Sequence, residues 1–96
     1  MDKRTEYRLQ AIEKFGEDYY ATKVTGIEIE EADVNYAKCS LKINRNHLNA
    51  MGFVMGGAIF TLADFAFAIA SNTGNPPTVS LTSQINYINA TRGPLL

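Results

Sequence analysis

A glycine-bearing loop followed by an apolar helix, from His47 to Asn72, contains the residues whose types and spacing could do chemistry. Asp64 is the only ionisable side chain of this helix, and no lysine or arginine lies between Arg45 and Arg92. Burial among apolar neighbours would therefore disfavour the charged carboxylate, unless a nearby group hydrogen-bonds to it. Asp64 is a candidate acid, base or nucleophile. The alternative is a carboxylate that faces solvent or bonds to the neighbouring backbone.

Gly56 and Gly57 stand where this helix should begin. Bare backbone N–H groups at a helix start stabilise developing negative charge, although glycines also occur there for close packing. Gly56 and Asp64 are separated by roughly 12 Å along one helix, whereas a reacting carbonyl must lie about 3 Å from both its oxyanion donor and the attacking group. Two such helices crossing antiparallel in a dimer satisfy this condition. If both residues act, the site is shared between subunits.

Three other residues of the chain could carry chemistry. Asn49 can donate or accept a hydrogen bond from the loop, or it can stabilise an Asx-type turn. His47 is the only histidine, with no second histidine or cysteine near it, so we expect loop structure and neither a zinc site nor a catalytic triad. Cys39, the only cysteine, falls on an apolar strand face and should be an inert core residue. No cofactor is expected.

Composition places the chain among soluble globular domains. It has 96 residues, 46% of them hydrophobic, and a net charge of −1 without a basic run. Nucleic acid and anionic membrane surfaces are therefore not expected partners. The first ten residues lack the apolar core of a signal peptide. The longest apolar stretch, residues 58–70, would span roughly 20 Å, which is too short to cross a bilayer. We expect a cytoplasmic protein.

The elements that must position these residues follow from periodicity and turn signals. The pattern predicts a helix over 2–16, strands over 23–30 and 35–43 joined by a turn or bulge at 31–33, a loop over 44–55, a helix over 56–72, a strand over 78–88, and a turn at 91–94 that enters another strand. Apolar residues occur all around the second helix, so it should be buried on most sides. Three strands leave it under-covered, which requires more chain or a partner.

One combination of motifs resembles a known family. The run His47–Gly57 (HLNAMGFVMGG), followed by Thr61–Asp64 (TLAD), is similar to the hotdog-fold acyl-CoA thioesterases of the phenylacetate-degradation (PaaI-like) type. Their usual pattern is N-x-x-G-x-x-H-G-G and then a long apolar helix containing L-A-D or L-V-D. Residues 79–88 with Arg92-Gly93 resemble the family's next strand and turn. The resemblance implies an α+β hotdog fold, in which a curved antiparallel sheet wraps around a central helix, and assembly into a homodimer or homotetramer.

The resemblance also implies roles for individual residues. Asp64 would be the nucleophile or the general base for water, and the backbone N–H of Gly56 would polarise the thioester carbonyl. Asn49 would orient the carbonyl or the water, and Ser80 would help to position the water. The remaining motif residues are the expected substrate contacts: Met55, Gly57 and Thr61.

Two departures from the family pattern matter. Met55 stands where the family has a histidine, and methionine supplies neither an N–H nor a charge. The family also continues for some thirty to forty residues, forming two further strands. We therefore expect residues 1–96 to be a single hotdog domain that is incomplete at its C-terminal side, with strand edges left exposed.

These observations predict hydrolysis of acyl-CoA thioesters to free acid and CoA, at a site shared across a dimer interface. An acyl-CoA is the expected small-molecule partner. The alternative is a non-catalytic or weakly active hotdog protein that binds acyl-CoA or CoA esters, and Met55 is the residue that favours it. Hydratase or dehydratase chemistry would need a histidine beside the carboxylate, and His47 is not at the expected position.

Overall fold

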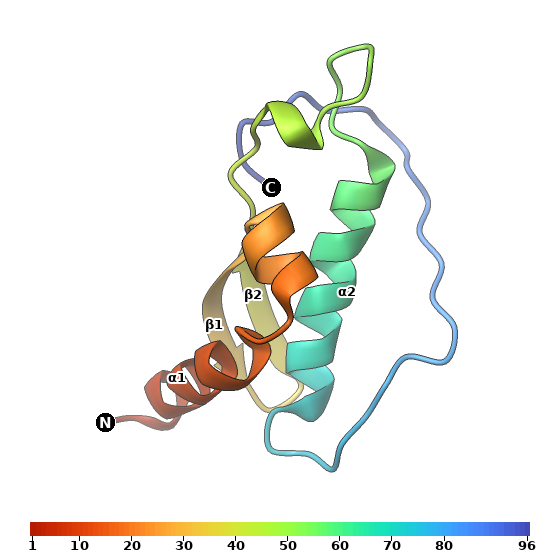
Figure 1. The fold of residues 1–96 in the computed structure, drawn as a ribbon. Helices are drawn as coiled ribbons and strands as arrows, with labels where there is room; N and C mark the ends of the chain where they lie inside the picture. Colours follow the sequence, from red (N-terminus) through yellow and green to blue (C-terminus); the bar gives the residue numbers. More distant parts are fainter.

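Two helices pack against one antiparallel hairpin, and a short π-helix contacts the second of these helices (Figure 1). The computed structural model describes all residues from 1 to 96. Its elements are, in order, α1 (Lys3–Phe15), the π-helix η1 (Tyr20–Thr25), β1 (Glu28–Asp33), β2 (Tyr36–Ser40), the 3-10 helix η2 (Arg45–His47) and α2 (Gly56–Asn72). Helix α1 contacts β1, and α2 contacts mainly β2. This arrangement confirms the α+β class.

Helix α1 begins and ends where its sequence predicts. The carboxylate of Asp2 caps it by accepting a hydrogen bond of 2.8 Å from the backbone N–H of Thr5. At the other end Gly16 follows Phe15, and a Cβ at Gly16 would lie only 2.5 Å from the carbonyl oxygen of Ile12. The buried Ala11 and the half-buried ring of Phe15 turn one face of α1 into the core.

The first predicted strand is wrong over its N-terminal part. Residues 20–25 form η1, and the chain becomes extended only after Gly26, whose positive φ of 92° ends that helix. The weak alternation of residues 23–30 could not distinguish these states. Thr25 is buried and its carbonyl serves a tertiary hydrogen bond, so a distant contact holds this turn in place.

The hairpin itself is present, with its turn displaced by a few residues from the prediction. β1 and β2 pair antiparallel from Glu28 opposite Ser40 to Asp33 opposite Tyr36, with an irregularity between Ile29 and Glu31. The turn lies after Asp33 and uses Asn35 at a φ of 58°, a left-handed conformation that asparagine tolerates.

The core is one cluster shared by every element except η2. Its buried members are Ala11, Ala21, Ile27, Ile29, Ala32, Leu41, Phe65 and Ile69. Helix α2 contributes Phe65 and Ile69, one turn apart on the face toward the hairpin. The ring of Phe65 meets the ring of Phe15 edge to face, with centroids 6.3 Å apart.

Helix α2 has the predicted bounds, but the prediction that it is buried on most sides is wrong for the single chain. Ala63, Asp64 and Phe67 are exposed on its outer side. A two-stranded sheet with α1 and η1 covers one face of a helix only, and the remaining apolar face is covered only in part, by the irregular segment after α2.

The predicted strand at 78–88 is also absent. This segment runs apart from the hairpin on the far side of α2, without a paired strand (Figure 1). Leu81 is 99% exposed there. A strand needs a neighbouring strand for its backbone hydrogen bonds, and no free edge of the hairpin lies beside these residues.

Residues 91–96 return to the hairpin and pair with the chain after β2. Leu41 and Leu96 exchange backbone hydrogen bonds of 3.0 and 2.9 Å, and the N–H of Ile43 donates to the carbonyl of Pro94 over 2.8 Å. The predicted turn into an extended segment is thus present as an isolated bridge. None of the helices has the length and apolar character needed to cross a bilayer.

The packing of α2 against the core leads to a prediction about stability. Ile69 is 0% exposed, so Ile69→Ala should lower the free energy of unfolding by about 2 to 5 kcal/mol, through lost burial and the cavity left behind. Urea unfolding measures the change. Leu9→Ala is the matched control because Leu9 is 47% exposed, and it should cost less than about 1 kcal/mol. Equal losses in the two variants would contradict this packing.

Candidate functional site

Asp64 opens onto the largest groove of the molecule. This groove, of about 600 Å³, lies between η1 with the residues before it and the middle of α2. It is lined by Asp18, Tyr19, Tyr20, Ala21, Phe60, Thr61, Asp64, Phe65 and Ala68. Asp64 is exposed and makes no hydrogen bond within the chain, so of the two sequence alternatives the solvent-facing one holds here. Its carboxylate is free to meet a ligand.

The start of α2 offers unused backbone donors. Met55 occupies the N-cap position without a side-chain cap, and the N–H groups of Gly56 and Gly57 have no partner within the helix. The hydroxyl of Tyr87 donates to the carbonyl of Gly56 over 2.8 Å, and a Cβ on Gly56 would lie 2.9 Å from the Tyr87 ring. A Cβ on Gly57 would meet nothing within 4 Å, so packing inside the chain does not require that glycine.

One chain does not bring Gly56 and Asp64 together. They lie in the same helix, α2, eight residues and therefore roughly 12 Å apart. The separation inferred from the sequence is thus a property of the folded chain. A carbonyl bound at the glycine N–H groups cannot also touch the carboxylate of the same helix.

Asn49 organises its own loop. Its side-chain oxygen accepts hydrogen bonds from the N–H groups of Met51 (2.9 Å) and Phe53 (3.1 Å), and its backbone pairs with Phe53. The turn-stabilising role left open by the sequence is therefore present. The side-chain amide nitrogen donates no bond within the chain, and Asn49 shares a groove of about 280 Å³ with Gly56.

The other predicted contact residues are distributed around α2. Thr61 lines the large groove, and its hydroxyl donates to the carbonyl of Gly57 over 2.8 Å. Met55 and Gly57 line a separate hollow that also contains His47.

Ser80 makes no hydrogen bond to Asp64 within this chain. Its hydroxyl lies 2.7 Å from that of Ser83, and both residues are exposed. Ser83, with Gln84 and Ile85, lines a smaller groove of about 220 Å³ that Asp64 also borders. Asp64 therefore stands between two grooves, one facing η1 and one facing the segment after α2.

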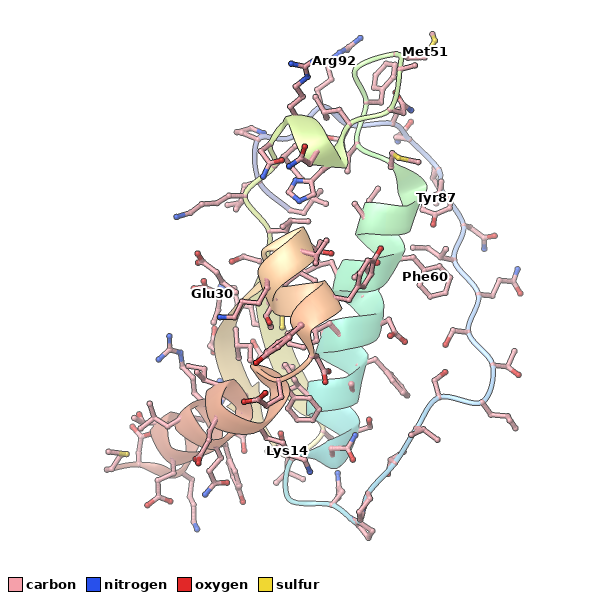
Figure 2. The ribbon with its side chains drawn as sticks, viewed as in Figure 1. Lys14, Glu30, Met51, Phe60, Tyr87 and Arg92 are labelled. Atoms are coloured by element: carbon pink, nitrogen blue, oxygen red, sulfur yellow. The ribbon has the colours of Figure 1, made fainter.

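Several groove residues escaped the sequence reading. Tyr19, Tyr20 and Phe60 line the groove with Asp64, and Figure 2 shows Phe60 projecting from α2. The two adjacent tyrosines are evident in the sequence. Their position at the groove depends on η1, which turns them toward α2 and which the sequence pattern did not predict.

His47 connects three parts of the structure and confirms the expected loop role. The ring is buried; its Nδ1 accepts from the N–H of Asn44 over 3.0 Å, which leaves Nε2 to donate to the carbonyl of Thr25 over 2.7 Å. The His47 carbonyl accepts from the N–H of Met55 over 2.8 Å. This one residue therefore fixes η1 relative to the start of α2.

Cys39 is half-buried and unreactive in character. Burial raises the pKa of its thiol to about 11, and the carboxylate of Glu30 acts in the same direction. A thiolate is the reactive form, so Cys39 is no nucleophile at neutral pH. No group of three or more His, Cys, Asp or Glu side chains is placed to hold a metal ion.

Solved structures with the same fold give the first comparison with known proteins. PaaI from the phenylacetic acid degradation operon of E. coli is 27% identical and superposes with a TM-score of 0.78, over 90% of this chain and 62% of that one. The conserved protein PA5202 from Pseudomonas aeruginosa is 26% identical with a TM-score of 0.70, over 77% of this chain and 62% of its own. These likenesses confirm the hotdog fold expected from the motif. No protein-family model matches the chain.

Curated relatives agree with that comparison. A "Putative esterase" from Archaeoglobus fulgidus is 40% identical over 62 residues, which is 65% of this chain and 40% of the relative. A "Putative esterase" from Deinococcus radiodurans is 33% identical over 70 residues, or 73% of this chain and 47% of the relative. The chain thus spans less than half the length of these curated relatives.

The position of His47 gives a prediction about the site's framework. His47→Ala should lower the free energy of unfolding by about 2 to 4 kcal/mol, because it leaves the buried Thr25 carbonyl and the part-buried Asn44 N–H without their partners. Thermal or urea unfolding measures it. Asn46→Ala, one residue away with an exposed side chain, is the control and should change stability by less than about 0.5 kcal/mol. A His47 variant as stable as the Asn46 variant would show that the link is dispensable.

Proposed function

We propose that this chain, which belongs to the PaaI-like hotdog proteins, hydrolyses an acyl-CoA thioester to the free acid and CoA at a site shared by two copies. The observation that carries the proposal is the exposed Asp64 at the wall of an apolar groove, in a chain with this fold. The esterase names of the relatives support hydrolysis as the reaction class.

The groove suits binding of the acyl group, and the carboxylate suits activation of the attacking water. The aromatic rings of Tyr19, Tyr20 and Phe60 can bury an acyl group. With Asp64 as general base, water attacks the carbonyl carbon, and its proton passes to the carboxylate. The C–S bond then breaks, and the CoA sulfur takes the proton from Asp64. Direct attack by the carboxylate, with later hydrolysis of an anhydride, uses the same position.

The oxyanion donor must then come from the second copy. The N–H of Gly56 is free, but it lies roughly 12 Å from Asp64 along α2. Antiparallel crossing of two α2 helices would bring Gly56 of the partner subunit to Asp64. The exposed apolar side of α2, which includes Ala63 and Phe67, supports such a contact, and a homodimer or a homotetramer provides it equally.

Binding of acyl-CoA without turnover is the second candidate. Met55 is the observation that favours it, because an exposed methionine stands beside the free glycine donors where the family has histidine. The first candidate requires that the backbone donors alone suffice.

Mixed dimers test the shared site. Asp64→Ala and Gly56→Pro should each lower kcat for acyl-CoA hydrolysis by at least about 100-fold. Proline removes the Gly56 N–H yet suits the first position of a helix, and Met55 already has the extended φ of −62° and ψ of 139° that precedes proline well. The new Cβ would lie 2.9 Å from the ring of Tyr87, so the end of this exposed side chain must move aside in the variant. Co-refolding the two variants should restore about one quarter of wild-type activity, since half of the dimers would hold one intact site.

Glu13→Gln, a carboxylate on α1 outside the groove, is the control for charge loss and should leave kcat unchanged. A co-refolded mixture that recovers no activity would reject a site shared between two copies. Full turnover by Asp64→Ala would reject the catalytic role of that residue.

Restoring the family residue separates the two candidates. Met55→His should raise kcat by about 10-fold if a polar group beside Gly56 is the limiting element. Steady-state assays over an acyl-CoA panel measure it, with Met51→His in the exposed loop as the matched control. Tight acyl-CoA binding with no hydrolysis in wild type and Met55→His alike would favour the binding protein.

A further inference from the structure

The groove beside Asp64 is acidic and has no counter-charge. Of the side chains that line it, Asp18 and Asp64 are carboxylates, and none is a lysine, arginine or histidine. Asp18 is exposed, and only its backbone takes part in hydrogen bonds within the chain. Lys14, the basic residue closest to Asp18 in sequence, instead lies over the ring of Phe15, 5.7 Å from its centroid. The groove therefore has a negative potential that attracts cations.

Aromatic rings stand beside these carboxylates. Tyr19 and Tyr20 line the groove from the side of η1, with exposed fractions of 60% and 67%, and Phe60 lines it from α2. Figure 1 shows η1, drawn in orange, beside α2. The face of an aromatic ring attracts ammonium and quaternary ammonium groups, and it also packs against the carbon atoms attached to them.

An organic cation fits this combination of side chains better than a metal ion does. No third His, Cys, Asp or Glu side chain joins the two carboxylates in a group that could hold a metal. Hard metal ions bind several oxygen ligands at once, and aromatic rings add nothing to such a set. Rings together with a carboxylate are surroundings that stabilise an alkylammonium group.

The two carboxylates lie at different places along the groove. Tyr20 also borders the hollow at the start of α2, so it marks the end of the groove nearest that start. Asp18 lies on the side of the core, because its N–H donates to the carbonyl of Phe15 over 3.0 Å and the ring of Phe15 meets Phe65. An acyl group whose carbonyl is at Asp64 can therefore extend along the rings toward Asp18.

We propose that this groove selects acyl groups that end in an alkylammonium cation, which Asp18 binds together with the rings of Tyr19 and Tyr20. The inference rests on the proposed function for the identity of the ester and for the position of its carbonyl at Asp64. A neutral acyl group of the same shape would gain the ring contacts without the charge attraction. An acyl group that ends in a carboxylate would meet like charge and be disfavoured.

Matched pairs of esters test the proposal. Each pair consists of an acyl-CoA that ends in a trimethylammonium group and its neutral isostere that ends in a tert-butyl group, for example 4-(trimethylammonio)butanoyl-CoA and 5,5-dimethylhexanoyl-CoA. Within a pair only the charge differs, since one nitrogen replaces one carbon. Over a series of spacer lengths, the best cationic ester should have a kcat/KM about 10-fold above that of its isostere. Glutaryl-CoA, with a terminal carboxylate, should be the poorest substrate.

Variants assign the preference to the groove. Asp18→Asn should bring the ratio of the two kcat/KM values close to one, mainly through a higher KM for the cationic ester. Tyr20→Leu should lower the ratio and Tyr20→Phe should keep it, because the ring face and not the hydroxyl meets the cation. Glu17→Gln is the matched control: it removes an adjacent exposed carboxylate that does not line the groove, and it should keep the wild-type ratio.

Salt gives a second readout that a purely structural role of Asp18 would not move. Raising the ionic strength should lower the ratio in wild type and leave it unchanged in Asp18→Asn, since screening acts on the charge contact alone. A wild-type ratio of one at every spacer length would overturn the proposal, as would a ratio that Asp18→Asn and Glu17→Gln lower equally.

Binding separates this proposal from the proposed function. Non-hydrolysable thioether analogues of the same ester pairs, titrated calorimetrically into the full chain, report the charge preference without turnover. A preference for the cationic analogue that depends on Asp18, without hydrolysis of any ester, would reject the thioesterase and leave the selection intact. Hydrolysis of neutral esters at least as fast as cationic ones would reject the selection and leave the thioesterase intact.

Discussion

The packing of α2 against the hairpin, through Phe65 and Ile69 with Leu41, is the contact on which the rest of the structure depends. It fixes the rotation of α2 about its axis, and so decides which residues turn outward. With Phe65 and Ile69 directed into the core, Asp64 and Phe67 are exposed. The position of Asp64 at the groove therefore follows from the apolar contacts of its neighbours and needs no polar contact of its own.

The same helix sets the limits of any chemistry. A straight helix keeps its first N–H groups and its middle carboxylate a fixed distance apart, so Gly56 and Asp64 cannot serve one small group in one chain. The exposed apolar side of α2 offers a surface on which a second copy could pack. A second copy placed there would cover that side and supply the missing partner residue at once.

Hydrogen bonding divides the polar residues of the motif into two kinds. His47 and the side-chain oxygen of Asn49 are occupied by bonds that hold the loop and η1 in position. The N–H groups of Gly56 and Gly57 and the carboxylate of Asp64 have no partners in the chain. The first kind builds the framework, and the second kind is available to a ligand. The free groups also differ in place: the donors lie at the start of α2, and the acyl-sized groove lies at its middle.

The sequence by itself determined α1, α2 with its exact bounds, the hairpin and the loop role of His47. These are local properties: caps, glycine stops, a two-residue period and a lone histidine without partners. The motif around Gly56 and Asp64 also determined the hotdog fold, which the similarity to PaaI confirms. The roles of Asn49, Ser80 and the other motif residues remain predictions.

Only the tertiary structure decided the rest. Residues 20–25 form a π-helix whose last residue, Thr25, is hydrogen-bonded to His47 far along the chain, and that helix brings Tyr19 and Tyr20 to the groove. Residues 78–88 have strand periodicity but no strand, since pairing depends on a neighbour that local sequence cannot supply. The stacking of Arg92 on Phe53 likewise joins residues 39 positions apart. The periodicity of apolar residues in the sequence indicates which side chains are buried, whereas these contacts depend on which segments of the chain lie next to each other in the fold.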